Sequence, residues 1–353
     1  MMIASLALAL LASAESARPT TDTTFAIRTG TRVVVENHAG QIQVDTWNRS
    51  EIRVVAQHKR RAHLVFDPSP GRLEISAEGA MGEPVWVDYT ITVPAETPLE
   101  LSGIDTDIEV NGSRAEIKAE SVQGDVIVHG GDGPVSVSSV EGAVEVVGPR
   151  GRVEASSVNR SARVVGAHGA VQATAISGDV YLEDLDSDDV EGSTINGQVF
   201  FVGAYKANGS YSFTTHDGDL VVAVPEKASV SGSVSTFQGD FESAFPVETT
   251  EKRRGKQIHF TLGDGSARLE IEAFNGDVKL DRPEAVAKAM AEARSSSDEE
   301  RLEKHVEKHV EESMMKSSKH TSEYDKKHQK EMEKKKNKDK DKDKDENDEE
   351  EER

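Results

Sequence analysis

The 353-residue chain carries 64 acidic and 42 basic side chains, which leave a formal net charge of −22. Only 36% of its residues are apolar and 5% are aromatic, so a core built on large rings is excluded. The absence of cysteine excludes disulfides, thiolate catalysis, cysteine-based zinc sites and a lipid-anchored lipoprotein, and the acidic balance argues against general nucleic-acid binding.

Residues 1–14 are predicted to be a secretory signal peptide. An apolar run from Ile3 to Ala12 ends in the small residues Ala12-Ser13-Ala14, which are typical of a cleavage site, although no basic residue precedes the run. The run is too short for a transmembrane helix, which needs about 20 residues, and no later segment approaches that length. The sequence therefore predicts an exported chain without a transmembrane segment, located in the periplasm, on the cell surface or outside the cell.

Residues 20–98 are predicted to form an N-terminal β cap region. The segment from Val33 to Val44 fits the repeat described below and predicts one outlying coil. Four further strands are expected within residues 52–55, 63–66, 72–75 and 85–93, in antiparallel arrangement, because they are short β-type runs separated by turn residues.

Residues 99–283 contain an internal repeat. A glycine, or a residue in its place, recurs with spacings of 18, 18, 18, 18, 19, 21, 21 and 37 residues. Apolar residues stand two and four positions after it, and five and seven before it, which is the period of strands with one buried face. Small residues such as Ser121 are followed directly by apolar ones such as Val122, which indicates that the buried parity flips at a corner. The repeated positions are Thr106, Gly124, Gly142, Arg160, Gly178, Gly197, Gly218, Gly239 and Gly276.

Each unit therefore reads as strand, corner, strand and loop in about 18–21 residues. Stacked in parallel, such coils bury a continuous Val/Ile/Leu core. The predicted fold is an all-β parallel β-helix, or β-solenoid, with irregular β caps. Before the last coil, the runs 256–262 and 267–273 are joined by Gly263-Asp264-Gly265, which predicts a hairpin that caps the far end.

Residues 284–333 are predicted to form a charged helix, and residues 334–353 a disordered low-complexity tail. Leu302, Val306, Val310 and Met314 draw one narrow apolar stripe on that helix. His305 and His309 lie one turn apart, but HVEKH is not the metalloprotease motif, and we interpret both as solvated.

The order of these parts resembles a bacterial family of exported putative-adhesin domains of unknown function, the group that includes LiaG-like and YvlB-like envelope proteins. The resemblance rests on VVVENHAGQIQV (33–44), YTITVPAETPLEL (89–101), the repeated Gly-Asp-Val segments and TLGDGSARLEIEAFNGDVKL (261–280). It covers about residues 30–280. It implies a β-solenoid in the cell envelope or outside the cell, with no catalytic or ligand-binding residues to transfer. The tail from residue 284 and the coil 157–164, with Arg160 in place of glycine, depart from the pattern.

The glycine positions and the aspartates that follow them are the most regular polar feature. We interpret them as a structural turn column, in which glycine takes left-handed dihedrals and aspartate accepts hydrogen bonds from the following backbone N–H groups. Paired carboxylates would also suit glycoside hydrolysis or cation binding, but Ala143, Ser161 and Gln198 interrupt the series. The column comprises Gly124, Asp125, Gly142, Gly178, Asp179, Gly197, Gly218, Asp219, Gly239, Asp240, Gly276 and Asp277, with Asp107 preceding it.

Other candidate sites are weaker. A calcium β-roll needs tandem GGxGxD, and only Gly130-Gly131-Asp132-Gly133 comes near it, once. Basic residues gather at Arg150, Arg152, Arg160 and Arg163, at 59–61 and at 252–254; they could meet an anionic polymer, but we interpret them as solvated charges or ion pairs. No catalytic, cofactor-binding or metal-binding residue is predicted.

These observations favour a non-enzymatic, exported β-solenoid that acts as an adhesin-like scaffold or interaction surface for an envelope or surface component, protein or glycan. One alternative is a polysaccharide-binding or polysaccharide-cleaving β-helix that uses Asp179 and Asp219. Another is an envelope-stress accessory protein that docks a partner through its tail.

Overall fold

The computed structural model describes residues 20–58, 62–251 and 256–296. The predicted signal peptide, the basic triplets Lys59-Arg60-Arg61 and Lys252-Arg253-Arg254, and every tail prediction beyond residue 296, His305 and His309 included, lie outside the described residues. The chain divides into two compact units, residues 1–290 and 291–353, and the first holds all of the described strands.

The described residues form 25 strands, one short 3-10 helix and a helix over residues 283–296. The first part of the chain contains β1 (Thr20–Ala26), β2 (Arg32–Trp47), β3 (Glu51–His58), β4 (His63–Ser69), β5 (Arg72–Glu78), η1 (Ala80–Gly82) and β6 (Trp86–Pro94). The central coils contain β7 (Leu99–Ser113), β8 (Ile117–Ser121), β9 (Val126–Gly130), β10 (Val135–Ser139), β11 (Val144–Val147), β12 (Val153–Ser157), β13 (Ala162–Val165), β14 (Val171–Ala175), β15 (Val180–Leu185), β16 (Asp189–Asn196), β17 (Val199–Gly203), β18 (Ser210–Asp217) and β19 (Leu220–Ala223). The last part contains β20 (Val230–Gln238), β21 (Phe241–Ser243), β22 (Glu248–Glu251), β23 (Lys256–Leu262), β24 (Ala267–Asn275) and β25 (Val278–Asp281).

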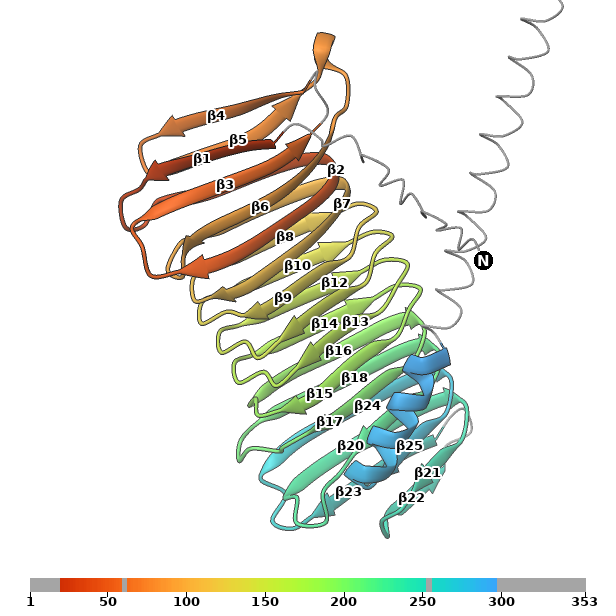
Figure 1. Cartoon of the computed structure of the whole chain (residues 1–353). Helices are drawn as coiled ribbons and strands as arrows, with labels where there is room; N and C mark the ends of the chain where they lie inside the picture. The colour runs from red at the N-terminus through yellow and green to blue at the C-terminus, as the bar shows by residue number, and fades with distance from the viewer. Residues whose placement is uncertain (1–19, 59–61, 252–255, 297–353) are drawn as a thin grey trace, which may run out of the picture. The chain divides into compact units, whose positions relative to one another are not determined.

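Each central coil gives one strand to each of two parallel sheets, so the predicted β-solenoid is confirmed (Figure 1). The first sheet runs through β8, β10, β12, β14, β16 and β18, and the second through β9, β11, β13, β15, β17 and β19. Strands pair without offset: Val135 lies between Ile117 and Val153. Because alternate side chains point between the sheets, these three are at most 1% exposed. The core is therefore a stack of similar layers, mostly aliphatic, with Phe201, Tyr211 and Phe213 in the later coils.

At the N-terminal end, β2 and β7 are long enough to run through both sheets. Val33 pairs with Leu99 and Ile42 with Ile108, which confirms the outlying coil expected for residues 33–44. Beyond β2, the first sheet continues with β5 and β4 and the second with β6, β3 and β1. β5 and β6 pair with β2 in parallel, whereas the remaining pairs are antiparallel, as expected.

At the other end, the coils do not stack in chain order. β24 and β25 form the last coil in the sequence, yet they pair with β18 and β19 on one side and with β20 and β21 on the other. β23 pairs with β20 and β22. The predicted hairpin of 256–262 with 267–273 is therefore wrong, because β20 lies between its two strands. The turn at Gly263-Asp264-Gly265 carries the chain across β20.

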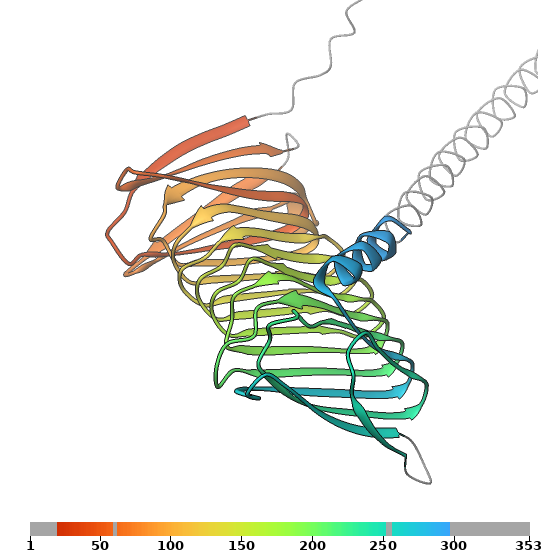
Figure 2. The ribbon, with the colours of Figure 1, turned by 90° about the horizontal axis from the view of Figure 1, so that it is seen from below.

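Residues 283–296 are helical, at the start of the segment predicted as a charged helix. The first turns of this helix lie beside the strands (Figure 2), and Val286 and Met290 are only 1% and 3% exposed.

Because side chains alternate along a strand, those of Tyr181 and Phe200 point out of the second sheet. Each is nevertheless only 2% exposed, and their rings stack with a centroid distance of 5.5 Å. The outer surface of the second sheet is thus partly covered. Within the described residues, no helix combines the length and apolarity needed to cross a membrane.

Candidate functional site

The corner between the two strands of each coil is the most regular part of the molecule. A Cβ atom on Gly124 would lie 1.9 Å from the carbonyl oxygen of Thr106, and one on Gly142 would lie 2.0 Å from that of Gly124. The same contact recurs at Gly178, Gly197, Gly218, Gly239 and Gly276. Only Gly197 and Gly218 of these have positive φ, so the expectation that the column takes left-handed dihedrals is wrong for the rest. At these seven positions an added side chain would meet the backbone of the adjacent coil, which favours glycine.

The aspartates of this column join one coil to the next. Asp125 Oδ1 accepts a hydrogen bond from the backbone N–H of Ala143 at 2.8 Å, and Asp179 Oδ1 accepts one from Gln198 at 2.8 Å. The acceptor and the donor are 18 or 19 residues apart, so the predicted bonding of each aspartate to the N–H groups that directly follow it is replaced by bonding between coils. The same bond joins Asp107 to Asp125, Asp219 to Asp277, and Asp277 to Asp240.

A second ladder, of buried hydroxyl groups, was not recognised in the sequence. Ser139 donates to the carbonyl of Gly124 at 2.7 Å and accepts from the N–H of Gly142 at 2.9 Å, so it satisfies polar groups of two coils. The signal was present, since a serine or threonine stands three residues before most column glycines. The hydroxyls that donate in this way belong to Ser121, Ser139, Ser157, Thr194, Thr215 and Thr236, all at most 5% exposed.

The apolar residue after each buried hydroxyl points outward. Ser121 and Gly124 are buried, but Val122 between them is 43% exposed, so the parity flips at the corner with the apolar side chain on the outside. Its backbone is held in place: the N–H of Glu141 donates to the carbonyl of Val122 at 2.8 Å. We define the corner stripe, in its spatial order, as Ile104, Val122, Val140, Val158, Ile176, Ile195, His216, Phe274 and Phe237.

The stripe ends in aromatic rings. Phe274 lies between His216 and Phe237, with centroid distances of 4.9 Å to each and interplanar angles of 22° and 8°. Both phenylalanines are more than 40% exposed. A shallow groove of about 550 Å³ lies beside them, lined by Ile195, the aromatic rings, and the hydroxyls and carboxylate of Ser193, Thr214, Ser235 and Glu272.

The outer surface of the first sheet is flat and polar. Its side chains alternate with the buried ones, so that Ser138 and Ser156 lie on neighbouring strands at the same height. We call this surface the polar face. It contains Lys118, Glu120, Ser136, Ser138, Glu154, Ser156, Gln172, Thr174, Glu191, Ser193, Ser212, Thr214, Ser233, Ser235, Glu270 and Glu272.

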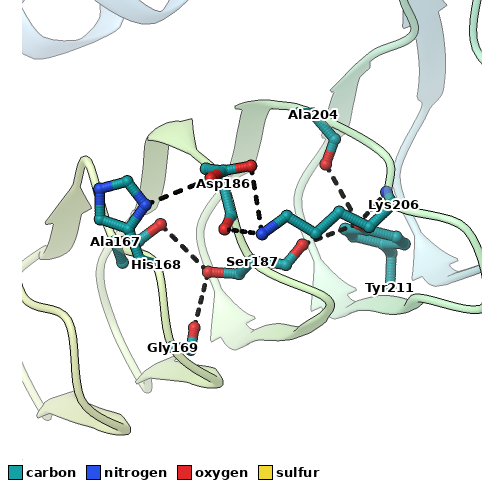
Figure 3. Close-up of polar contacts among 8 residues, drawn as sticks. All are labelled: Ala167, His168, Gly169, Asp186, Ser187, Ala204, Lys206 and Tyr211. Carbon is teal, nitrogen blue, oxygen red and sulfur yellow. Dashed lines mark hydrogen bonds and ion pairs between the residues drawn. The ribbon is translucent and has the colours of Figure 1, made fainter.

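The opposite edge of the solenoid, shown in Figure 3, carries ion pairs across three coils. Asp186 contacts His168 Nδ1 and Lys206 Nζ, each at 3.2 Å, and these two contacts, with Lys206 the stronger, lower the pKa of Asp186. Beneath them, the fully buried Ser187 donates to the carbonyls of Ala167 and Gly169. Tyr211 donates to the Ser187 carbonyl at 2.8 Å, and burial raises its pKa. The hydrogen bonds of Ser187 and Tyr211 therefore join neighbouring coils at the edge where the loops between coils are longer.

Comparison with protein families decides the classification. The sequence profile described as Toastrack DUF4097 matches residues 31–280, from the start of β2 to the end of β25. The chain belongs to this family.

Solved structures similar to this Toastrack chain share little sequence with it. They include a putative adhesin from Parabacteroides merdae (10% identity, TM-score 0.42, covering 74% of this chain and 96% of that one) and a putative adhesin from Bacteroides fragilis (12%, 0.36, 74% and 97%). A third is a putative cell adhesion protein from Clostridium sporogenes (8%, 0.20, 75% and 100%). No curated protein matches the chain.

The predicted basic spot of the Toastrack domain is largely engaged in ion pairs. Arg163 lies between Glu145 and Glu183, donating to Glu183 Oε1 at 2.8 Å, with 18% of its side chain exposed. Arg152 pairs with Glu154 at 3.0 Å and Arg150 with Asp132 at 3.9 Å, both at the surface. Arg160 stands in the glycine column, where its carbonyl lies against Gly178.

The aspartates considered for catalysis serve the stacking of the Toastrack coils. Besides its bond to the next coil, Asp179 accepts from the Tyr181 hydroxyl at 2.9 Å, and the second oxygen of Asp219 lies 3.4 Å from the Gln198 side-chain amide. Lys256 pairs with Asp240 and lowers its pKa. Among the described residues, no group of three His, Asp or Glu side chains could hold a metal ion.

Proposed function

We propose that this Toastrack protein is a non-enzymatic, exported scaffold of adhesin type, which binds a component of the cell envelope or surface through the polar face. The observation that supports this most is the regularity of that face: hydroxyl, amide and carboxylate side chains recur on adjacent parallel strands, about 4.8 Å apart, over the length of the first sheet. Such an array suits a ligand that is itself repetitive, such as a glycan or an extended protein.

The stacking bonds make this surface rigid. The aspartate and hydroxyl ladders hold most coils to the next at the corner, and the longer loops are fastened around Ser187 and Tyr211. A rigid array loses little conformational entropy when it binds. Several weak polar contacts along one polymer then add up through their high effective concentration.

Binding of the full chain to glycan arrays and to isolated envelope fractions tests the proposal. The variant Ser156→Arg/Thr174→Arg places two large cations in the middle of the polar face. The matched control, His129→Arg/Glu242→Arg, places them on exposed positions of the second sheet. We expect saturable binding to at least one fraction, about tenfold or more weaker in the face variant and unchanged in the control. No binding by the wild type, or equal binding by all three proteins, contradicts the proposal.

The alternatives give different results in the same experiment. Binding through residues 297–353 would be unaffected by the face substitutions. A polysaccharide-cleaving enzyme would release reducing ends, and Asp179→Asn/Asp219→Asn would abolish the release; either result replaces our proposal. Export is tested separately by N-terminal sequencing of the mature protein, which should begin at Glu15 if the signal peptide ends at Ala14.

A further inference from the structure

We propose that the corner stripe is a self-association surface, through which two copies of this chain pair side by side in antiparallel orientation. The stripe is a line of outward-facing side chains, all apolar except His216, on a protein with a net charge of −22. Ile104, Val122, Val140, Ile176, Ile195, Phe274 and Phe237 are 41–49% exposed. Soluble monomers rarely leave large apolar patches open to water.

The positions beside the centre of the stripe are depleted in charge, whereas Asp105, Glu120, Asp217 and Glu272 flank its two ends. Next to the four central positions, Val140 to Ile195, the flanking residues are Ser138, Ser156, Thr174 and Ser193 on one side, and Glu141, Asn159, Ser177 and Asn196 on the other. Glu141 is the one charged side chain among these eight. Depletion of charge around an apolar centre is the composition of a protein–protein interface. It also lowers the electrostatic repulsion between two acidic molecules that meet at the centre of the stripe.

The spacing of the stripe identifies the partner. Its side chains repeat once per coil, about every 4.8 Å. An α-helix repeats every 5.4 Å and an extended strand presents the same side about every 6.7 Å, so either would lose register within a few contacts. A second stack of coils has the same repeat and stays in register over the whole length. We therefore infer that the partner is a second copy of this chain.

The aromatic end argues against a sugar as the occupant of the stripe. Sugars stack on exposed faces of aromatic rings, but both faces of the Phe274 ring are occupied, one by His216 and the other by Phe237. The Phe274 ring therefore presents its edge, and not a face, to a ligand. A ring edge packs well against aliphatic side chains, such as those in the rest of the stripe on a second copy.

The sizes of the side chains favour the antiparallel orientation. Ile104 and Val122 lie at one end of the stripe, and Phe274 and Phe237 at the other. Antiparallel pairing places the large rings of each copy against the small side chains of its partner and gives an even separation. A two-fold axis then passes beside Ile176, the middle residue. A strip about 40 Å long and 15 Å wide would bury about 1,200 Å² in the pair, the lower end of the range for specific interfaces.

Sedimentation of the full chain tests the self-association. We expect the wild type to form a dimer, and Val140→Asp/Ile195→Asp to weaken the association about tenfold or more, because the pair would have to bury four carboxylates in a largely apolar contact. The control Gln172→Asp lies on the polar face and should remain dimeric. Circular dichroism and the unfolding midpoint establish that the substitutions at exposed positions leave the fold intact. A monomeric wild type, or a dimer unaffected by the stripe variant, overturns the proposal.

Single cysteines test the orientation, since the chain has none of its own. Ile176→Cys should form a disulfide between two copies. Val122→Cys alone should not, but a mixture of Val122→Cys and Phe274→Cys chains should. Ready cross-linking of Val122→Cys with itself would overturn the antiparallel arrangement. The polar-face variant Ser136→Arg/Gln172→Arg, which lies outside the residues that flank the stripe, should lose the proposed ligand binding but keep the dimer, so failure of the proposed binding function and failure of this inference are separately detectable.

Discussion

The carbonyl oxygen of Gly124 occupies the space that a side chain on Gly142 would need: a Cβ atom there would lie 2.0 Å from it. Consecutive coils therefore touch backbone to backbone at the corner. The close approach brings Asp125 Oδ1 to the N–H of Ala143 and Ser139 Oγ to the carbonyl of Gly124. These contacts recur in most coils and stabilise the stacking at the corner.

Gly142→Ala should destabilise the chain by on the order of 3 kcal/mol, because the coils must separate to admit the methyl group. Gly148→Ala is the matched control. Gly148 has a φ of +67° but no atom within 4 Å of an added Cβ, so its substitution should cost only about 1–2 kcal/mol for the left-handed backbone. Urea unfolding of both variants measures the difference. Equal losses would show that backbone conformation, not close approach, selects glycine at 142.

Ser139→Ala should cost about 1–3 kcal/mol, because it leaves the buried Gly124 carbonyl and Gly142 N–H without their partner. Ser139→Thr should be tolerated, since Thr194, Thr215 and Thr236 fill the same position in other coils. The outward-facing neighbour gives the control: Ser138→Ala should change the free energy of unfolding by less than about 0.5 kcal/mol. A loss from Ser138→Ala as large as that from Ser139→Ala would refute the bridging role.

Arg163→Gln should destabilise the chain by about 2 kcal/mol, because Glu145 and Glu183 would then lie close together with no cation between them. The value is below that of a fully buried pair, since 18% of the arginine side chain is exposed. Arg152→Gln breaks a pair in which both side chains are more than half exposed and should cost about 0.5 kcal/mol or less. The thermal unfolding midpoints of the two variants, measured at one salt concentration, should show the larger loss of stability for Arg163→Gln.

Asp186→Asn should lower the unfolding temperature at neutral pH but not in acid. Lys206 and His168 lower the pKa of Asp186 below its ordinary value of 3.8 in the folded chain. A lowered folded-state pKa contributes stability that is complete above about pH 4 and is lost as the pH falls through the lowered value. The difference from wild type should therefore shrink below pH 4. Asp189→Asn, at an exposed position nearby, should show no such convergence.

Engineered cysteine pairs should reveal the order of the last coils. Ser212 and Ser233 each lie directly beside Glu270 on adjacent parallel strands, about 4.8 Å away, within reach of a disulfide. Ser212→Cys/Glu270→Cys and Ser233→Cys/Glu270→Cys should each oxidise within one chain. Ser212→Cys/Ser233→Cys should not, because these strands are two positions apart. Rapid oxidation of the last pair would mean that the coils stack in chain order.

Repetition made most of the fold predictable. Glycines 18 residues apart and apolar residues two apart are local signals, and they identified the coils, the two sheets and the buried layers. The residues of the predicted turn column contact the adjacent coil, which the sequence interpretation did not foresee. A Gly-Asp pair predicts a local turn, whereas here both residues face the adjacent coil. The contacts that explain them, such as Asp179 to Gln198, join residues 19 positions apart.

By itself, the sequence determined that this chain is a parallel stack of thin coils with an aliphatic core, because strand periodicity and coil length are written in each repeat. Only the tertiary structure decided which coils are neighbours at the far end. Their columns are so alike that Leu269 pairs equally with Tyr211 on one side and Gly232 on the other. It also decided that Val122 and its equivalents face water, because the direction of a side chain at a corner depends on how the backbone bends there.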